Sequence, residues 1–306
     1  MPGVPIVDLA IEAGSRSETP TALVDAVGLA CTEIGFFVVI GHGLEPVMDH
    51  MFGAARSLFA LPERGKESLA MVERQGFVPA YHRRVDPTIH SAPMEYYDVG
   101  TEGTPRWPSR ADLAGFDDIV RSYQRAVLIT ASDLLRVLAI GLDLEPGFFA
   151  ERMRAPRCFL RMMHYEPRAP GAEGTPEVLT DPHTDYGLIT LLATDGVGGL
   201  EVSDRSGSWR KVTAPAGSLV VNLGDMLARW TNDRYVSTPH RVIAPSGRDR
   251  YSVPFFVNPD PSAVVSCLPS CVDERHPCRY RPVTAGTFLA RRIAEGGYMD
   301  GAATTS

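Results

Sequence analysis

The pattern of apolar and polar positions divides the chain into a helix-rich first half and a strand-rich second half. Residues 34–40 (IGFFVVI) are a short apolar run rich in aromatic and β-branched side chains, and Gly-His-Gly at 41–43 ends it. Such a run predicts a buried strand. Apolar residues with helical spacing recur at 21–32, 46–59 and 116–142. We therefore expect three helices around one early strand.

The second half has short apolar runs separated by glycine, proline and aspartate. We expect strands at 159–165, 187–193, 199–203, 219–223, 240–243 and 252–257, and a last helix at 284–295. Many short strands with turn residues between them are typical of a sandwich or barrel. The predicted fold class is therefore α+β, with a β-sandwich core, N-terminal helices and a C-terminal helix.

Composition narrows the class of protein. The 306 residues are 44% hydrophobic, enough for one large domain or two modest ones. The net charge of −7 argues against nucleic acid or an anionic membrane as a partner. We find no apolar run of about eighteen residues, the length that a membrane span needs. The first ten residues lack the pattern of a secretory signal, so we expect a cytoplasmic enzyme without a protein partner.

The cysteines offer a weak alternative chemistry. Their number is odd, and they are scattered through the chain at Cys31, Cys158, Cys267, Cys271 and Cys278. That distribution argues against a disulfide framework. The last three, together with His276, suggest a zinc site, but their spacing does not match paired C-x2-C knuckles. We expect reduced thiols.

Two histidines and one aspartate stand out as metal ligands. In His183-Thr184-Asp185 an imidazole and a carboxylate are two residues apart, so in an extended segment both point to the same face. His240 comes later, at the start of another predicted strand. Two imidazoles and one carboxylate on one face of an octahedron form the facial triad of non-haem iron(II) oxygenases.

A predicted anion clamp follows the second histidine. Arg250-Tyr251-Ser252 begins the last predicted strand, so the guanidinium and the hydroxyl share one strand face. A guanidinium fork beside a hydroxyl is suited to holding a carboxylate. An organic acid bound there could reach the metal with its other end.

With these motifs the sequence resembles the isopenicillin N synthase-like family of iron(II)- and 2-oxoglutarate-dependent dioxygenases, over nearly the whole chain. The segments that carry the resemblance are 4–9, 35–43, 54–62, 183–192, 222–226, 237–242 and 250–256. The resemblance implies a double-stranded β-helix (jelly-roll) core with flanking helices. It also implies a single catalytic unit over residues 1–306, with an N-terminal region at 4–110 and the core at 155–260.

The resemblance implies roles for single residues. Iron(II) would be held by His183, Asp185 and His240, and the co-substrate 2-oxoglutarate by Arg250 and Ser252. Tyr165 would assist, although Met163 and His164 before it depart from the Asn-Tyr-Tyr-Pro pattern of the family. Dioxygen is the other co-substrate, and no protein acid or base is expected beyond the metal ligands.

Substrate residues are less constrained by the sequence. Arg161 is a candidate anchor for a polar substrate, with a surface salt bridge as its alternative. Phe256 lies on the same strand face as Ser252, as a pocket residue or a core aromatic. We interpret His164 as a neighbouring pocket or strand residue, and 74–97 as a segment that supplies a mobile lid.

The expected reaction is oxidation of a small organic molecule by hydroxylation, desaturation or cyclisation, in the biosynthesis of a specialised metabolite. Three alternatives remain open. One is an oxidase of the same family that does not use 2-oxoglutarate. The second is a non-catalytic jelly-roll protein that binds a small acid. The third is a zinc hydrolase, for which no additional general base is placed by the sequence and the anion clamp has no explanation.

Overall fold

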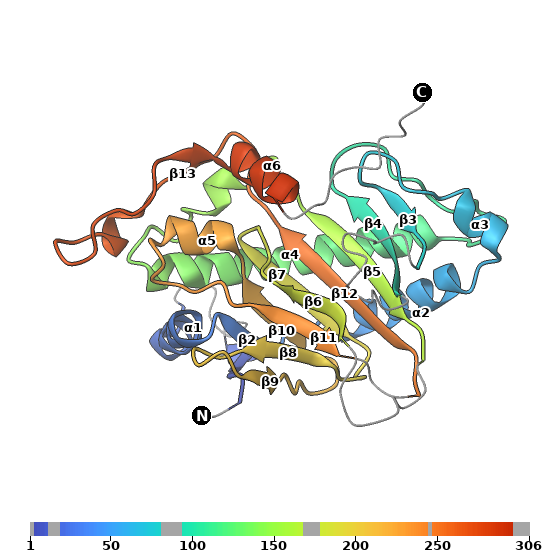
Figure 1. Cartoon of the computed structure of the whole chain (residues 1–306), viewed down its shortest axis with the longest axis horizontal. Coiled ribbons are helices and arrows are strands. Elements are labelled where there is room, and N and C mark those ends of the chain that lie inside the picture. Colours follow the sequence, from blue (N-terminus) through green and yellow to red (C-terminus); the bar gives the residue numbers. More distant parts are fainter. Residues whose placement is uncertain (1–2, 12–18, 81–93, 168–177, 244–246, 296–306) are drawn as a thin grey trace.

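Two β-sheets face each other in the computed structural model, which describes residues 3–11, 19–80, 94–167, 178–243 and 247–295 (Figure 1). Within these residues, the strands of the larger sheet are, in order, β1 (Ile6–Asp8), β2 (Phe36–Ile40), β10 (Leu219–Leu223), β7 (Ile189–Thr194), β12 (Arg250–Val257), β5 (Phe159–Tyr165), β4 (Met94–Gly100) and β3 (Gly76–Val78). The smaller sheet has β6 (Val178–His183), β11 (His240–Ile243), β8 (Leu200–Ser203) and β9 (Trp209–Lys211). A two-stranded ribbon pairs β13 (Val264–Val265) with β14 (Val283–Thr284).

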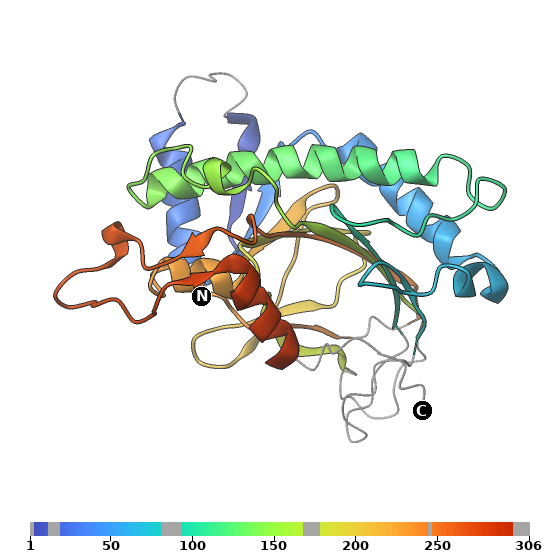
Figure 2. The same ribbon diagram turned by 90° about the horizontal axis from the view of Figure 1, so that it is seen from above.

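Helices cover the outer face of the larger sheet (Figure 2). The α-helices are α1 (Thr21–Glu33), α2 (Glu45–Phe59), α3 (Glu63–Glu67), α4 (Phe116–Gly141), α5 (Asp225–Trp230) and α6 (Ala285–Glu295), and short 3-10 turns are η1 (Leu9–Ile11), η2 (Ala150–Arg152) and η3 (Pro269–Cys271). Among them α4 lies along the sheet and buries Val120, Val127 and Leu134, which recur at intervals of seven residues. That spacing places them on one helix face. No helix in the described part of the chain has the length and hydropathy to cross a membrane.

Two apolar clusters hold the layers together. The larger one lies between the helices and the outer face of the larger sheet, and the smaller one lies between the two sheets. Residues of β10 are buried on both faces, with Val221 in the first cluster and Val220 in the second. A strand covered on both sides has a nearly continuous apolar sequence. This explains why Leu219–Leu223, which is apolar except for Asn222, was predictable without alternation.

The arrangement confirms the predicted α+β fold with a jelly-roll core and flanking helices. The expected strand at 187–193 begins two residues later, at Ile189, because the backbone of Gly187 and Leu188 accepts hydrogen bonds from the start of α5.

The prediction of a mobile lid at 74–97 is wrong for both ends of that segment, because they form β3 and the start of β4. Residues 81–93 lie outside the described residues.

The expectation of five reduced thiols is wrong for one pair. Cys267 and Cys278 form a disulfide, whereas the other three cysteines are free and buried. The pairing of β13 with β14 closes the intervening segment into a loop, which brings the two cysteines together. An odd cysteine count across the chain says nothing about such local closure. Among the described residues, these cysteines and His276 do not form a group able to hold a metal ion.

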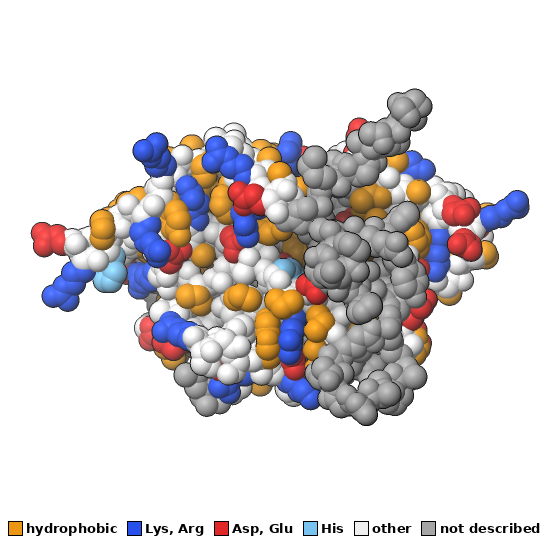
Figure 3. Space-filling model, viewed as in Figure 1, with side chains coloured by type: hydrophobic (Ala, Val, Ile, Leu, Met, Phe, Trp, Pro, Cys, Tyr) orange, Lys and Arg blue, Asp and Glu red, His pale blue; other side chains and the backbone are white. Residues whose placement is uncertain are grey.

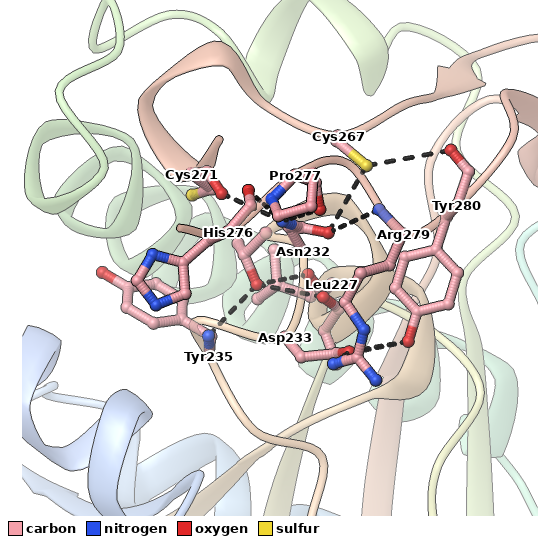
Figure 4. A network of polar contacts seen from close by, with 12 residues as sticks. Leu227, Asn232, Asp233, Tyr235, Cys267, Cys271, His276, Pro277, Arg279 and Tyr280 are labelled. Atoms are coloured by element: carbon pink, nitrogen blue, oxygen red, sulfur yellow. Dashed lines mark hydrogen bonds and ion pairs between the residues drawn. The ribbon is translucent and has the colours of Figure 1, made fainter. Parts of the chain in front are cut away.

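The same loop is fastened to the body of the protein by Asn232, just after α5 (Figure 4). Its side-chain amide donates hydrogen bonds to the carbonyl oxygens of Cys271, His276 and Pro277 at 3.1, 3.3 and 3.3 Å. Its side-chain oxygen accepts from the backbone N–H of Arg279 at 3.0 Å. Asn232 has φ 54°, a conformation that asparagine tolerates better than most residues. One amide therefore satisfies four backbone groups of a loop that has little regular structure.

Candidate metal centre

The three predicted metal ligands lie together at one end of the sandwich. His183 ends β6 and His240 begins β11, and the two are direct partners in the antiparallel pair. Asp185 follows in the loop toward β7. One nitrogen of each imidazole and one carboxylate oxygen all lie within 4.8 Å of one another. The strand pairing thus closes the gap in sequence between the two histidines.

Both imidazoles are oriented by backbone carbonyl groups. Nδ1 of His183 lies 2.8 Å from the carbonyl oxygen of Asp181, and Nδ1 of His240 lies 3.3 Å from that of Thr238. Because a carbonyl oxygen only accepts, Nδ1 carries the proton in each ring and Nε2 keeps its lone pair. Nε2 of His240 lies 3.9 Å from Oδ1 of Asp185, so the two donor atoms face a common point.

The carboxylate of Asp185 is held by two neutral donors. Thr190 Oγ1 and Asn222 Nδ2 both donate to Oδ2, at 2.5 and 2.7 Å, which leaves Oδ1 for a metal. Burial alone would raise the pKa of Asp185, but the neighbouring imidazoles and these two donors bring it below its ordinary value. The group is therefore an ionised ligand, and the donor set fits a divalent transition metal such as iron(II).

We predict that Thr190→Val weakens iron(II) binding by about tenfold, because a hydroxyl that orients a ligating carboxylate typically contributes between 10- and 100-fold to affinity. Valine keeps the shape of threonine and removes only the donor to Asp185. Thr190→Ser keeps the hydroxyl and is the matched control. Anaerobic equilibrium dialysis measures both affinities; equal affinity of Thr190→Val and the native chain would contradict this role.

The loop that carries Asp185 is fixed by the start of α5. The backbone N–H of Asp225 donates to the carbonyl oxygen of Asp185 at 2.7 Å, and Thr184 Oγ1 donates to the Asp225 carboxylate at 3.0 Å. Arg292 of α6 donates to the same carboxylate at 2.6 Å, with its guanidinium 4.8 Å from the ring centre of Tyr186. Sequence reasoning missed these contacts because they join three segments that are distant along the chain.

The predicted anion clamp is deeply buried. Arg250 is 1% exposed and Ser252 is 2% exposed. The guanidinium donates to Ser252 Oγ and to the carbonyl oxygen of Gly198, both at 3.1 Å. No carboxylate among the described residues forms an ion pair with Arg250. A buried guanidinium without a counter-ion is costly, so this site fits an anionic ligand such as a carboxylate of 2-oxoglutarate.

Tyr165 lies beside the clamp. It is the strand partner of Arg250, whose guanidinium carbon is 4.8 Å from the tyrosine ring centre. The tyrosine hydroxyl is 3.2 Å from Thr180 Oγ1 and 3.7 Å from Met163 Sδ. Thr180 escaped sequence reasoning because β6 was not predicted. The structure thus brings together the guanidinium and the two hydroxyl groups that the sequence predicts for the co-substrate, and it adds the hydroxyl of Thr180.

A cavity of about 710 Å³ opens next to the metal ligands. Its lining includes His183 and Asp185, and both predicted substrate residues, Arg161 and Phe256. Arg161 does form a salt bridge, with Asp98, but the pair is buried, since Arg161 is only 8% exposed. The alternative of a surface salt bridge is therefore wrong. Arg250 and Ser252 are not among the residues that line this cavity. Tyr165, which lies beside them, contacts two residues of the lining: Thr180 by a hydrogen bond and Met94 by strand pairing.

His164 faces the other side of the sheet, under α2. Its two ring nitrogens lie 2.8 Å from Glu95 and 2.8 Å from Asp249, and its ring stacks on Tyr251 at 4.6 Å. Lys66 also pairs with Glu95, at 2.8 Å. The interpretation as a pocket residue is therefore wrong, and the interpretation as a strand residue holds. Burial by itself lowers the pKa of His164, but the two carboxylates outweigh it and raise the pKa above 6.5.

We predict that His164 stabilises the fold most strongly in mildly acidic solution. A group whose pKa is raised by folding contributes its full stability below its unfolded pKa of about 6.5 and loses it as pH rises through the folded pKa. At pH 6 the free energy of unfolding of the native chain should exceed that of His164→Gln by about 1.5–3 kcal/mol, the contribution typical of hydrogen bonds to charged groups. At pH 9 the difference should be smaller. Urea unfolding at both pH values measures this; a difference independent of pH would contradict it.

The described part of the face seen in Figure 3 carries interspersed acidic and basic side chains.

Comparisons with known proteins agree with this geometry. Residues 156–259 match the model of the 2OG-Fe(II) oxygenase superfamily, and residues 4–117 match that of the non-haem dioxygenase in morphine synthesis N-terminal region. The chain is 35% identical, over 92% of its length and 86% of the relative, to the 2-oxoglutarate-Fe(II) type oxidoreductase hxnY of Emericella nidulans.

Solved structures are similar over nearly the whole chain. A 2OG-Fe(II) oxygenase family protein from Caulobacter crescentus superposes with a TM-score of 0.86 and 30% identity, over 95% of this chain and 99% of that one. A full-length Neurospora crassa protein in complex with alpha-KG (2-oxoglutarate) and thymine superposes with a TM-score of 0.84 and 26% identity, over 96% and 97%.

Proposed function

The chain belongs to the 2OG-Fe(II) oxygenase superfamily, and from that premise we propose that His183, Asp185 and His240 hold its iron and that Arg250 and Ser252 hold its co-substrate. The matched family model and a relative at 35% identity are named for 2-oxoglutarate- and iron(II)-dependent oxidation, so the protein is an oxidoreductase that oxidises a small organic molecule with dioxygen. One observation carries the residue assignment: a 2-His-1-carboxylate cluster lies within the same sandwich as a buried guanidinium that has no acidic partner among the described residues.

The bound iron would bring dioxygen and 2-oxoglutarate together and supply the oxidising power that protein side chains lack. The residues of the chain contribute binding and orientation. Arg250 and Ser252 would hold the distal carboxylate of 2-oxoglutarate, with Tyr165 and Thr180 beside it. Thr190 and Asn222 fix the rotation of Asp185, so that a single carboxylate oxygen faces the metal.

We further propose that residues 1–306 act as one catalytic unit, with the N-terminal region at 4–110 and the core at 155–260. Helices α1, α2 and α4 share one apolar cluster with the larger sheet, which supports a unit that folds as a whole. The substrate is a small molecule, and the net charge of −7 supports a role without nucleic acid. A cytoplasmic location stays a prediction; the Cys267–Cys278 disulfide is of a kind that is rare in reducing compartments.

An anaerobic titration of the metal-free protein tests the proposal. A weak visible charge-transfer band that requires both iron(II) and 2-oxoglutarate is expected, because the band arises only when the co-substrate chelates the metal. On admission of oxygen, succinate should form. Iron binding without the band, or substrate oxidation without succinate, would instead indicate an oxidase that does not use 2-oxoglutarate. Absence of iron binding would reject the metal assignment.

A further inference from the structure

The inner part of the substrate cavity contains a buried ion pair. Arg161 of β5 donates from Nε and Nη2 to the two carboxylate oxygens of Asp98 on β4, each at 2.7 Å. The two residues are direct strand partners and are 8% and 3% exposed. Both line the cavity. The positive charge of Arg161, which the sequence offered as an anchor for a polar substrate, is therefore already matched by a carboxylate.

Breaking the Arg161–Asp98 ion pair would cost free energy. Its geometry is the two-point fork that guanidinium and carboxylate groups form most strongly, and both groups are out of water. An anionic substrate group placed beside Arg161 would also lie beside Asp98, in a region where charges are poorly screened. A second ion pair among the described lining residues joins Arg157 to Glu102 at 2.6 Å; it is exposed, and its two charges cancel. Burial and pairing thus disfavour a charged substrate.

The wall on the same side is made of flat groups. The guanidinium carbon of Arg161 lies 4.1 Å from the ring centre of Tyr96. Next to it, the rings of Phe159 and Phe256 stack with centres 4.3 Å apart and planes at 18°. Flat rings prefer to pack on aromatic and guanidinium faces. The lining also includes the aliphatic side chains Leu289, Ala290 and Ile293 of α6.

We propose that this cavity takes an uncharged, flat ring compound, with the Arg161–Asp98 pair acting as the determinant that excludes carboxylates. The inference rests on the proposed function, since it names the substrate class of the same site. The volume of about 710 Å³ is in the range of sites that enclose a multi-ring small molecule.

Binding of matched probes tests this without turnover. The anaerobic protein, with iron(II) and 2-oxoglutarate bound, is titrated with 2-naphthamide and 2-naphthoate, which have the same ring and differ in charge. We expect the amide to bind at least about tenfold more tightly, a difference of about 1.4 kcal/mol. The saturated decahydronaphthalene-2-carboxamide should bind more weakly than the flat amide.

Two substitutions make the test specific. Asp98→Asn removes the charge that cancels Arg161, so the preference should shift toward 2-naphthoate by at least about tenfold. Arg161→Gln leaves the Asp98 carboxylate without its partner, so this variant should prefer the cation 2-naphthylmethylammonium to 2-naphthoate. It provides the test if Asp98→Asn does not fold. Glu201→Gln is the matched control, because Glu201 is also a buried partner of an arginine, Arg241 at 2.8 Å, but does not line the cavity.

The outcomes distinguish a failure of the inferred substrate class from a failure of the proposed function. Equal binding of naphthoate and naphthamide by the native complex would overturn the inference, as would an unchanged preference in both charge variants. Failure of every naphthalene probe to bind a complex that shows the charge-transfer band would also overturn it. Loss of that band in the native protein would instead reject the proposed function.

Discussion

Asp185→Ala is expected to abolish turnover, with a loss of at least about a thousandfold, because it removes the only anionic ligand of the proposed iron site. The two imidazoles would remain oriented by their backbone carbonyl partners. The variant would lack the ionised carboxylate that balances the charge of the metal in the proposed site. Iron(II) affinity should fall by more than the tenfold expected for Thr190→Val, since a ligand is lost and not only its orientation.

The measurement is iron(II) content after anaerobic dialysis, together with the charge-transfer band on addition of 2-oxoglutarate. Asp181→Asn is the control, because this carboxylate lies two residues before His183 on the same strand but is exposed and outside the cluster. It should retain iron and the band. A chain with Asp185→Ala that binds iron as tightly as the native one would require a different ligand and would reject the triad.

Sequence reasoning found the elements whose burial is simple. Strand β2 is a continuous apolar run and β10 is apolar except for Asn222, because both faces of each strand are covered, and α4 has a regular apolar stripe. For such segments a local pattern follows directly from the environment.

It missed β4 because the burial of this strand depends on partners that are not local. β4 carries two buried acids, Glu95 and Asp98, which a pattern of apolar residues does not predict inside a sheet. Their charges are matched by His164 and Arg161 from the neighbouring strand β5. Only the pairing of the two strands makes those polar positions compatible with burial.

The candidate site shows the same division. The spacing in His183-Thr184-Asp185 has a chemical meaning that can be read locally, and so does that of Arg250 and Ser252. Thr190 and Asn222 are neutral residues of core strands whose relation to Asp185 depends on the register of β7 and β10. In that register they are direct partners, which places both donors on one carboxylate oxygen.

Arg250→Met is expected to weaken 2-oxoglutarate binding by about 100-fold or more while leaving iron binding intact. Methionine fills much of the space of the arginine stem but removes the charge and its donors. Truncating one partner of a buried, hydrogen-bonded charge pair costs about 2–5 kcal/mol, and 2.7 kcal/mol corresponds to about 100-fold. The KM for 2-oxoglutarate should rise accordingly, and the charge-transfer band should reappear at high 2-oxoglutarate concentration.

Two further variants decide whether the guanidinium binds a carboxylate or only packs. Arg250→Lys keeps the charge but loses the fork, so its affinity should lie between that of the native chain and that of Arg250→Met. Arg210→Met changes an arginine of β9 that pairs with Asp204 and is partly exposed, so it should not affect the co-substrate. If Arg250→Met bound 2-oxoglutarate normally, the buried charge would have to serve another anion. Succinate-independent oxidation by the native enzyme would then be the result to look for, because an oxidase could devote the same clamp to the carboxylate of its substrate.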